Sequence, residues 1–204
     1  AVQIAKMLEE KAYIWGYATA TLEEAVLLRH SGIEKPILVL GCIFPDEMDE
    51  AIQNEVRITT YTTEIAQMLS ERAVSLGKNA YVHIKLDTGM ARLGFQITEE
   101  SADEIEKIAK LPGLSLEGMF THFAKADETD KTYTDQQFAN YMWMKEILEK
   151  RGVTFPYYHC SNSAGIIDIR KTNLDLVRAG ISIYGLYPSE DVEKKNVPLR
   201  PAME

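Results

Sequence analysis

The chain has 204 residues, of which 46% are hydrophobic and 26% are charged, and its formal net charge is −9. This length suits one sizeable α/β domain and is short for two, and the composition is that of an ordinary soluble globular protein. The negative charge argues against a nucleic-acid-binding surface and against docking on an anionic membrane. No apolar run approaches the roughly 20 residues of a membrane span, and no signal-peptide pattern is visible at Ala1.

Both cysteines, Cys42 and Cys160, lie outside any metal-binding spacing such as C-x-x-C. Two lone thiols beside predicted strands suit a reducing cytosol better than a disulfide scaffold. We therefore expect a cytoplasmic protein in which both cysteines act as small buried hydrophobic residues.

Short apolar runs, rich in β-branched and aromatic residues, recur along the chain at intervals of about thirty residues. Most are continuously apolar, which is typical of strands covered on both faces. The predicted strands are 13–18, 37–40, 56–61, 81–86, 116–122, 157–161 and 174–178.

Helices are predicted between these strands. A capping box at Thr21 to Glu24 should begin one of them, and a second capping box is predicted at 101–104. Gly77 should end another helix, because glycine is the usual residue just past a helix end. The remaining helices are predicted at 2–11, 46–54, 135–151 and 164–168.

This alternation predicts an α/β fold, a TIM-type (β/α)8 barrel in which eight parallel strands close into a ring. Only seven strands are predicted, and an open ring would leave two unpaired edges. The simplest interpretation is that the barrel lacks its first strand in this chain. We expect residues 1–197 to form this incomplete barrel domain and residues 198–204 to begin a second, C-terminal β domain.

Polar residues follow the last two predicted strands, where this fold usually binds phosphate. Asn162 and Ser163 open a short helix after one strand, and Gly180 and Ile181 follow the next. Glycine lets the backbone approach a ligand closely, and free N–H groups at such turns bind anions. Helix capping or a tight turn explains either motif alone, but both together favour a phosphate site.

Arg178 ends a buried apolar strand, where a guanidinium group needs an acceptor. A structural ion pair with Asp175 or Asp87 would supply one. Alternatively, Arg178 donates a hydrogen bond to a ring nitrogen of a cofactor. His159 on the neighbouring strand could orient Arg178, although a strand histidine is more often a satisfied core residue.

The segment from Lys85 to Gly94 reads KLDTGMARLG. An ammonium group inside a strand is unfavourable unless it is neutralised. The two glycines permit unusual backbone angles, and Arg92 should point over the barrel mouth as an anion clamp. A polar surface turn would explain the glycines but not the strand lysine.

His122 ends another predicted strand and could stack on an aromatic ring, donate a proton or bind a metal ion. The four histidines show no ligand spacing, so we expect no metal site.

At these residues the chain resembles the barrel domain of bacterial alanine racemases, which depend on pyridoxal 5′-phosphate. The similar stretches follow the family's order through nearly the whole chain. They are ATLEEAVLLRHSGI, PILVLG, VHIKLDTGMARLGF, GMFTHFAKAD, HCSNSAGI and VRAGISIYGLYPS.

The resemblance implies that Ser163 and the backbone of Gly180 and Ile181 hold the cofactor phosphate. It also implies that Arg178 faces the pyridine nitrogen and that His159 supports Arg178.

The resemblance further implies that His122 lies against the cofactor ring and that Arg92 contacts the ring oxygen and the substrate carboxylate. Lys85 matches a lysine that is often carbamylated in the family. A carbamate would turn a buried cation into an anion able to position Arg92.

The implied activity is an amino-acid racemase that interconverts L- and D-alanine, or L- and D-serine. The family reacts through a Schiff base between two opposed bases and supplies D-amino acids for cell-wall precursors. Its Schiff-base lysine ends the first strand, and its tyrosine base comes from the partner subunit's C-terminal domain. We therefore expect no catalytic base in this chain, a homodimer with a shared active site, and no nucleic-acid or membrane contact.

Two alternatives remain within this resemblance. The sequences HCSNSAGI and VRAGI resemble slightly more those of serine racemases associated with vancomycin resistance. Some of those racemases are fused to a membrane domain. A non-catalytic barrel that binds pyridoxal phosphate for homeostasis is the other, although RPAM looks like entry into a second domain. A related decarboxylase barrel fits less well, because KLDTGMARLG follows the racemase spelling.

Overall fold

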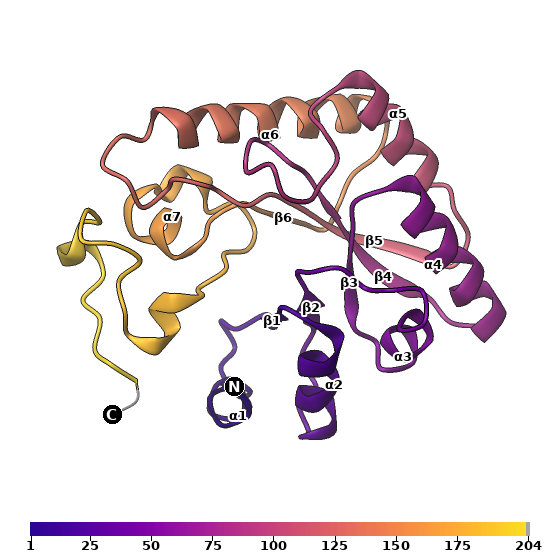
Figure 1. The fold of residues 1–204 in the computed structure, drawn as a ribbon, viewed down its shortest axis with the longest axis horizontal. Helices are drawn as coiled ribbons and strands as arrows, with labels where there is room; N and C mark the ends of the chain where they lie inside the picture. The colour runs from indigo at the N-terminus through magenta and orange to yellow at the C-terminus, as the bar shows by residue number, and fades with distance from the viewer. Residues whose placement is uncertain (203–204) are drawn as a thin grey trace. The chain divides into compact units, whose positions relative to one another are not determined.

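The computed structural model describes residues 1–202, in which strands and helices alternate (Figure 1). The strands are β1 (Tyr17–Thr19), β2 (Ile37–Val39), β3 (Arg57–Thr60), β4 (Ala80–Lys85), β5 (Leu114–Phe120) and β6 (Tyr157–His159). The α-helices are α1 (Val2–Leu8), α2 (Leu22–His30), α3 (Met48–Gln53), α4 (Thr63–Leu76), α5 (Glu99–Ile108), α6 (Thr132–Lys150) and α7 (Ser163–Asp168). Short 3₁₀ helices are η1 (Arg170–Thr172), η2 (Ile181–Tyr184) and η3 (Lys194–Asn196).

The strands follow one another in sequence order in a single sheet, from β1 to β6. Pairing is parallel, with Tyr17 opposite Ile37 in the first pair and Phe120 opposite His159 in the last. A helix connects each strand to the next. Parallel strands joined in this way place their carboxyl ends at one edge, which is where the predicted site residues follow β4, β5 and β6.

The seventh predicted strand, 174–178, is wrong as a strand. Within the described residues it contributes a single parallel bridge, between His159 and Leu176. The Asp175 carboxylate accepts a hydrogen bond from the backbone N–H of Tyr158 at 2.9 Å. The Asp175 carboxylate therefore takes the place of the backbone carbonyl that would accept from this N–H in a regular sheet. Regular strand pairing stops there.

Two predicted helix ends are confirmed. The backbone N–H of Glu24 donates to Thr21 Oγ1 at 3.3 Å, and the Glu24 carboxylate accepts from the Thr21 N–H at 3.4 Å, which completes the capping box of α2. Gly77 follows α4 in the left-handed conformation, with φ of 62°. That conformation suits glycine because it lacks a Cβ atom.

The second predicted capping box is wrong, because Ser101 lies inside α5 rather than before it. Thr98 takes the capping role, since its Oγ1 accepts a hydrogen bond from the Ser101 N–H at 3.2 Å. The serine at 101 resembled a cap only because an acidic residue follows it three positions later.

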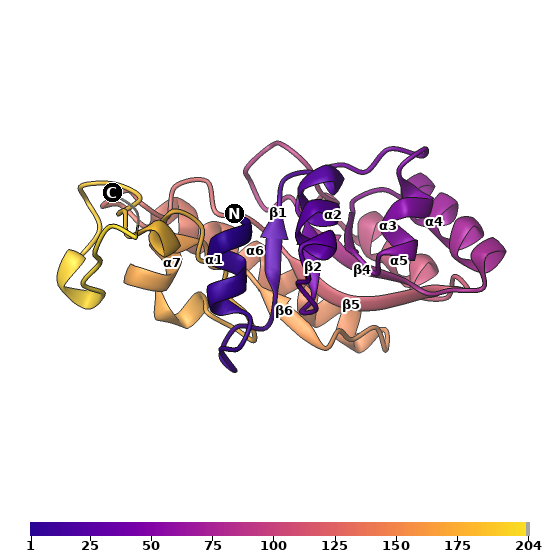
Figure 2. The same cartoon turned by 90° about the horizontal axis from the view of Figure 1, so that it is seen from below.

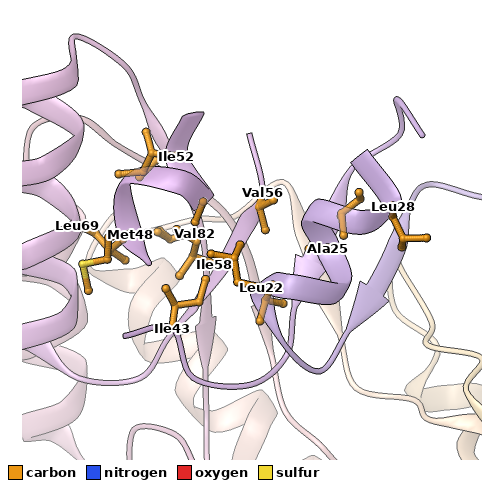
Figure 3. Packing of buried hydrophobic residues seen from close by; sticks show 14 of the residues in the cluster. Leu22, Ala25, Leu28, Ile43, Met48, Ile52, Val56, Ile58, Leu69 and Val82 are labelled. Carbon is orange, nitrogen blue, oxygen red and sulfur yellow. The ribbon is translucent and has the colours of Figure 1, made fainter. Parts of the chain in front are cut away.

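The chain contains two compact units. The first comprises Ala1–Ile84 and Glu104–Glu117. Its helices and strands enclose a hydrophobic core, and Figure 3 shows part of it. The residues labelled there are Leu22, Ala25, Leu28, Ile43, Met48, Ile52, Val56, Ile58, Leu69 and Val82. The Tyr17 hydroxyl donates to the Ala5 carbonyl at 2.8 Å and ties α1 to β1, which lie side by side in Figure 2.

The second unit comprises Lys85–Asp103 and the residues from Gly118 onward, and it holds every predicted site residue. On α6, Tyr141 is fully buried and its hydroxyl donates to the Met119 carbonyl of β5 at 2.8 Å. This contact fixes the helix against the strand that leads to the site.

Three further expectations concern membrane-spanning helices, the two cysteines and the start of a second domain. No helix within residues 1–202 is long and apolar enough to cross a membrane. Both cysteines are free; Cys160 is buried, whereas Cys42 is only partly buried. The predicted start of a second domain, 198–204, includes Met203 and Glu204, which lie outside the described residues.

Candidate functional site

Arg178 is held at the edge of the sheet by backbone carbonyls and one histidine. Its Nη2 donates to the carbonyls of Thr121 at 2.6 Å and Cys160 at 3.0 Å. Its Nη1 lies 2.7 Å from His159 Nδ1 and donates to the His159 carbonyl at 3.3 Å. The guanidinium group also lies over the Phe120 ring, 5.3 Å from its centre.

These contacts settle the tautomer of His159. Arginine only donates hydrogen bonds, so His159 Nδ1 must accept, and the single ring proton sits on Nε2. The ring is therefore neutral and orients Arg178. The structure places this histidine against Arg178, which is the arrangement that the first of the two sequence interpretations needs. Its role in a reaction stays a prediction.

The two carboxylates considered as ion-pair partners of Arg178 bind backbone N–H groups. Asp175 instead binds the backbone N–H of Tyr158. Asp87 accepts from the N–H groups of Gly89 at 3.1 Å and Ala91 at 3.0 Å.

One donor of the Arg178 guanidinium group remains unused. Its Nε is buried and has no hydrogen-bond partner among the described residues. A buried unpaired donor is unfavourable by about 1–3 kcal/mol. Burial lowers the pKa of Arg178 to about 10, which still leaves the group charged near neutral pH. A lone pair supplied by a ligand, such as the nitrogen of an aromatic heterocycle, would satisfy Nε.

A second cluster of donors converges on Ser163. The hydroxyl oxygen of Ser163 accepts from the N–H of Gly180 at 3.1 Å and from the N–H and hydroxyl of Ser182 at 3.3 Å and 3.0 Å. A hydroxyl oxygen has two lone pairs, so three donors exceed its capacity. Such a surplus of donors suits an anion with several oxygens, which a phosphate group provides.

The space in front of this cluster is open. A Cβ atom built on Gly180 would meet only Ser163 Oγ, at 4.0 Å. Ile181 begins η2 and is 44% exposed. The side chain of Asn162 caps α7, because its Oδ1 accepts from the Gly165 N–H at 3.1 Å. Any contact of Asn162 with a ligand would therefore come from other atoms.

Sequence reasoning missed Ser182. Its signal was available, since Ser182 lies two residues after Gly180 in the turn whose N–H groups were expected to bind an anion. Nothing in the local sequence shows that the hydroxyl of this serine points at Ser163.

Lys85 is buried at the end of β4, where its ammonium group contacts backbone carbonyls. Its Nζ donates to the carbonyls of Leu86 at 3.1 Å and Leu93 at 3.2 Å. Burial lowers the pKa of Lys85 to about 8, and the positive charges of Arg178 and Arg92 add to the effect. The ammonium group thus gives up its proton far more readily than an exposed lysine does.

His122 is partly buried and follows β5. Burial lowers its pKa to about 4, with further contributions from the charges of Arg178, Arg92 and Lys85. The imidazole ring is therefore neutral at physiological pH and suits stacking against a planar ligand. Arg92 itself is exposed, and its charge is felt at both His122 and Lys85.

The second unit therefore gathers three cationic side chains, two neutral imidazole rings, one unpaired guanidinium donor and a surplus of donors around Ser163. In the described part of the chain, no group of three or more His, Cys, Asp or Glu residues is placed to hold a metal ion. The arrangement fits an aromatic heterocycle with a basic ring nitrogen and a phosphate group. Pyridoxal 5′-phosphate has both features.

Comparison with known proteins points the same way. The sequence model described as "Alanine racemase, N-terminal domain" matches residues 1–188. The chain is 47% identical over 186 residues to the alanine racemase of Desulforamulus reducens, which covers 91% of this chain and 50% of that protein. It is 43% identical over 203 residues to alanine racemase 2 of Caldanaerobacter subterraneus, covering 100% and 52% respectively. The chain thus spans about half the length of the curated relatives it matches.

Solved structures agree with these relatives. The alanine racemase of Clostridium difficile 630 in complex with cycloserine superposes with a TM-score of 0.96 at 47% identity, covering 98% of this chain and 55% of that one. The alanine racemase of Bacillus anthracis with bound L-Ala-P gives a TM-score of 0.80 at 35% identity, covering 90% and 48%. These similarities confirm the predicted fold class, an α/β barrel of the TIM type.

Proposed function

Because the chain belongs to the alanine racemase N-terminal domain family, we propose that it carries the cofactor-binding part of an amino-acid racemase that interconverts L- and D-alanine. Alanine racemases are isomerases that depend on pyridoxal 5′-phosphate. One observation carries the proposal: the unpaired Arg178 Nε–H and the donor cluster around Ser163 lie in the same compact unit.

Different residues would bind different parts of the cofactor. Ser163, Gly180 and Ser182 would hold the phosphate through hydroxyl and N–H donors, with the Ile181 backbone beside them. Arg178 would donate its free Nε–H to the pyridine nitrogen. Pyridoxal phosphate, when bound, withdraws electrons from the substrate α-carbon and makes its proton removable.

Arg178 would act as a hydrogen-bond donor that keeps its own proton. A guanidinium group with a pKa of about 10 stays protonated near neutral pH, so it leaves a partner nitrogen unprotonated. His122 would lie against the cofactor ring in its neutral form, and Arg92 would bind the substrate carboxylate. None of these side chains is assigned a proton-transfer role.

A homodimer with a shared active site rests on the family alone. A cytoplasmic location, a barrel domain over 1–197 and the start of a second domain at 198–204 rest on the sequence pattern. A preference for serine rests only on the spellings HCSNSAGI and VRAGI, whereas alanine is supported by the relatives at 47% identity. Alanine is therefore the proposed substrate.

A racemisation assay of the full-length protein tests this function. Incubation with L-alanine and, separately, with L-serine should yield the D-enantiomer, with the higher kcat/KM for alanine. Chromatography that resolves enantiomers measures the D-alanine and D-serine formed. Absorbance spectra report whether pyridoxal phosphate is bound. Stoichiometric cofactor binding without racemisation of either amino acid would contradict the proposal and favour the non-catalytic homeostasis barrel.

We also propose that Lys85 is carbamylated. The ammonium group would first lose one proton, and the neutral amine would then attack the carbon of CO₂, forming an N–C bond while one C=O π bond opens to a carboxylate and a second proton leaves the nitrogen. The side chain thereby changes from a cation to an anion. The remaining N–H can still donate to the Leu86 or Leu93 carbonyl, and the new carboxylate would face Arg92. A pKa of about 8 makes roughly half of the amine neutral and reactive at pH 8.

With ¹³C-bicarbonate, NMR of the full-length protein should show one slowly exchanging carbamate signal. The signal should grow as pH rises from 6.5 to 8, because the neutral fraction of Lys85 grows over that range. Lys85→Met should abolish it, whereas Lys110→Met, at an exposed lysine, should leave it intact. Absence of the signal at pH 8 in the unmodified protein would refute carbamylation.

A further inference from the structure

One face of α6 holds the turn that carries Arg92. Tyr133, Gln137 and Asn140 are spaced so that they share this face of the helix. The Tyr133 hydroxyl donates to the Gly89 carbonyl at 2.6 Å, and Asn140 Nδ2 donates to the Thr88 carbonyl at 3.3 Å. The third residue, Gln137, reaches the Thr88 side chain. Figure 1 shows α6 beside the segment that follows β4.

Gln137 also holds a second loop of the site. Its side chain is fully buried, and its Nε2 donates to Thr88 Oγ1 and to the His122 carbonyl, both at 3.2 Å. Its Oε1 accepts from the Ala124 N–H at 2.9 Å. A buried amide is tolerated only when it is hydrogen-bonded, and all three bonds of this amide go to loops that carry candidate site residues.

The donor and acceptor of each hydrogen bond from Gln137 through Thr88 to Thr121 can be assigned. Thr121 Oγ1 donates its single proton to the Leu86 carbonyl at 3.0 Å. In the 2.8 Å contact between the two threonine hydroxyls, Thr88 must therefore be the donor and Thr121 the acceptor. Thr88 Oγ1 is then free to accept from Gln137, which fixes the amide in one orientation. Reversing the amide would place its oxygen against the His122 carbonyl.

The turn that Gln137 supports needs such support. Ala91, next to Arg92, has φ of 55°, a left-handed conformation that is unfavourable by roughly 1–2 kcal/mol for a residue with a Cβ atom. The Asp87 carboxylate stabilises the inside of the turn through the Gly89 and Ala91 N–H groups. The outside of the turn is held by α6. A strained turn persists only where its surroundings fix it.

We propose that Gln137 is a positioning residue that holds Arg92 beside the substrate carboxylate and His122 beside the cofactor ring. It acts on Arg92 through Thr88 and on His122 through its carbonyl oxygen. The role in substrate binding rests on the proposed function. The phosphate cluster around Ser163 receives no hydrogen bond from Gln137, so cofactor phosphate binding should not depend on this residue.

The test compares Gln137→Met with Gln137→Glu in the full-length holoenzyme. Methionine keeps the length of the side chain and removes all three hydrogen bonds. Glutamate keeps the acceptor for the Ala124 N–H and removes both donors. Thr134→Val is the matched control, since Thr134 is buried on the same helix and its hydroxyl has no partner among the described residues.

Both Gln137 variants should raise KM for alanine by about tenfold, with a smaller change in kcat, because a displaced carboxylate anchor weakens binding first. The inhibition constant of propionate, which has a carboxylate and no amine, should rise by a similar factor. The affinity for pyridoxal phosphate should fall by less than this factor, because the displaced His122 would contact only the cofactor ring and the donors around Ser163 stay in place. A loss of cofactor affinity larger than the rise in KM, or an unchanged propionate constant, would overturn the proposal.

Hydrogen exchange decides the positioning role even if no racemase activity is found. Amide exchange of residues 88–92 should accelerate in both Gln137 variants and stay unchanged in Thr134→Val. Acceleration at Ala124 alone, in Gln137→Met, would show that Gln137 supports only its own contact and would overturn the link to Arg92. Absence of racemase activity in the unmodified protein would instead count against the proposed function.

Discussion

Replacing Arg178 with lysine in the full-length protein should lower kcat/KM for alanine by at least about a hundredfold. The ammonium group keeps the charge but loses the planar fork of donors, so it cannot reach the Thr121 and Cys160 carbonyls and His159 Nδ1 together. Each buried acceptor left unpaired is unfavourable by about 1–3 kcal/mol, so the free energy of unfolding should also fall by roughly 2–4 kcal/mol. Chemical denaturation and enantiomer-resolved kinetics measure the two effects.

The chemical part of this expectation concerns side products. Lysine releases its proton more readily than arginine, so a lysine facing the pyridine nitrogen would let that nitrogen acquire a proton and favour fuller electron withdrawal. Transamination to pyruvate should then rise relative to racemisation. An unchanged pyruvate-to-D-alanine ratio would contradict this role for Arg178.

The choice of lysine follows from the structure. Arg178→Glu would aim a carboxylate at the carbonyls of Thr121 and Cys160, and that repulsion would disturb folding as well as chemistry. The matched control is Arg170→Lys in η1, because Arg170 is exposed and the same exchange there should change neither stability nor product ratio.

Local signals in the sequence predicted most helices and strands. The capping box at Thr21 and the glycine at 77 each act within a few residues, so they can be recognised without knowing the fold. The errors occurred where a distant partner decides. The segment 174–178 is apolar enough for a strand, but the Asp175 side chain binds the Tyr158 N–H and ends regular pairing.

The site could be predicted only in part, for the same reason. Ser163, Gly180 and Arg178 were found because they follow predicted strands, and parallel strands bring their ends together. Gln137 was not found, because a glutamine in a long helix looks like a solvent-exposed residue. Its partners, from Thr88 to Ala124, lie 13 to 49 residues away in the sequence, and no periodicity records such contacts.

The expected weakening of cofactor binding by Ser163→Ala is large and specific to the phosphate. The Ser163 hydroxyl is the centre on which the donors of Gly180 and Ser182 converge. A hydrogen bond to a charged partner contributes about 1.5–3 kcal/mol, which corresponds to a loss of affinity of roughly 10- to 150-fold. Titration of the apoprotein followed by absorbance gives the dissociation constant.

Pyridoxal without its phosphate is the matched ligand for this experiment. Its affinity should be the same for the unmodified protein and for Ser163→Ala, because the phosphate is the only part of the cofactor that the lost hydroxyl would contact. Ser182→Ala should weaken pyridoxal phosphate less, since it removes one donor and leaves the Ser182 N–H in place. Ser189→Ala, where the hydroxyl binds the Asp127 carbonyl, should change neither affinity. If Ser163→Ala weakened both ligands equally, the cluster would support the fold rather than bind phosphate, because only a phosphate-specific loss follows from a surplus of donors at that turn.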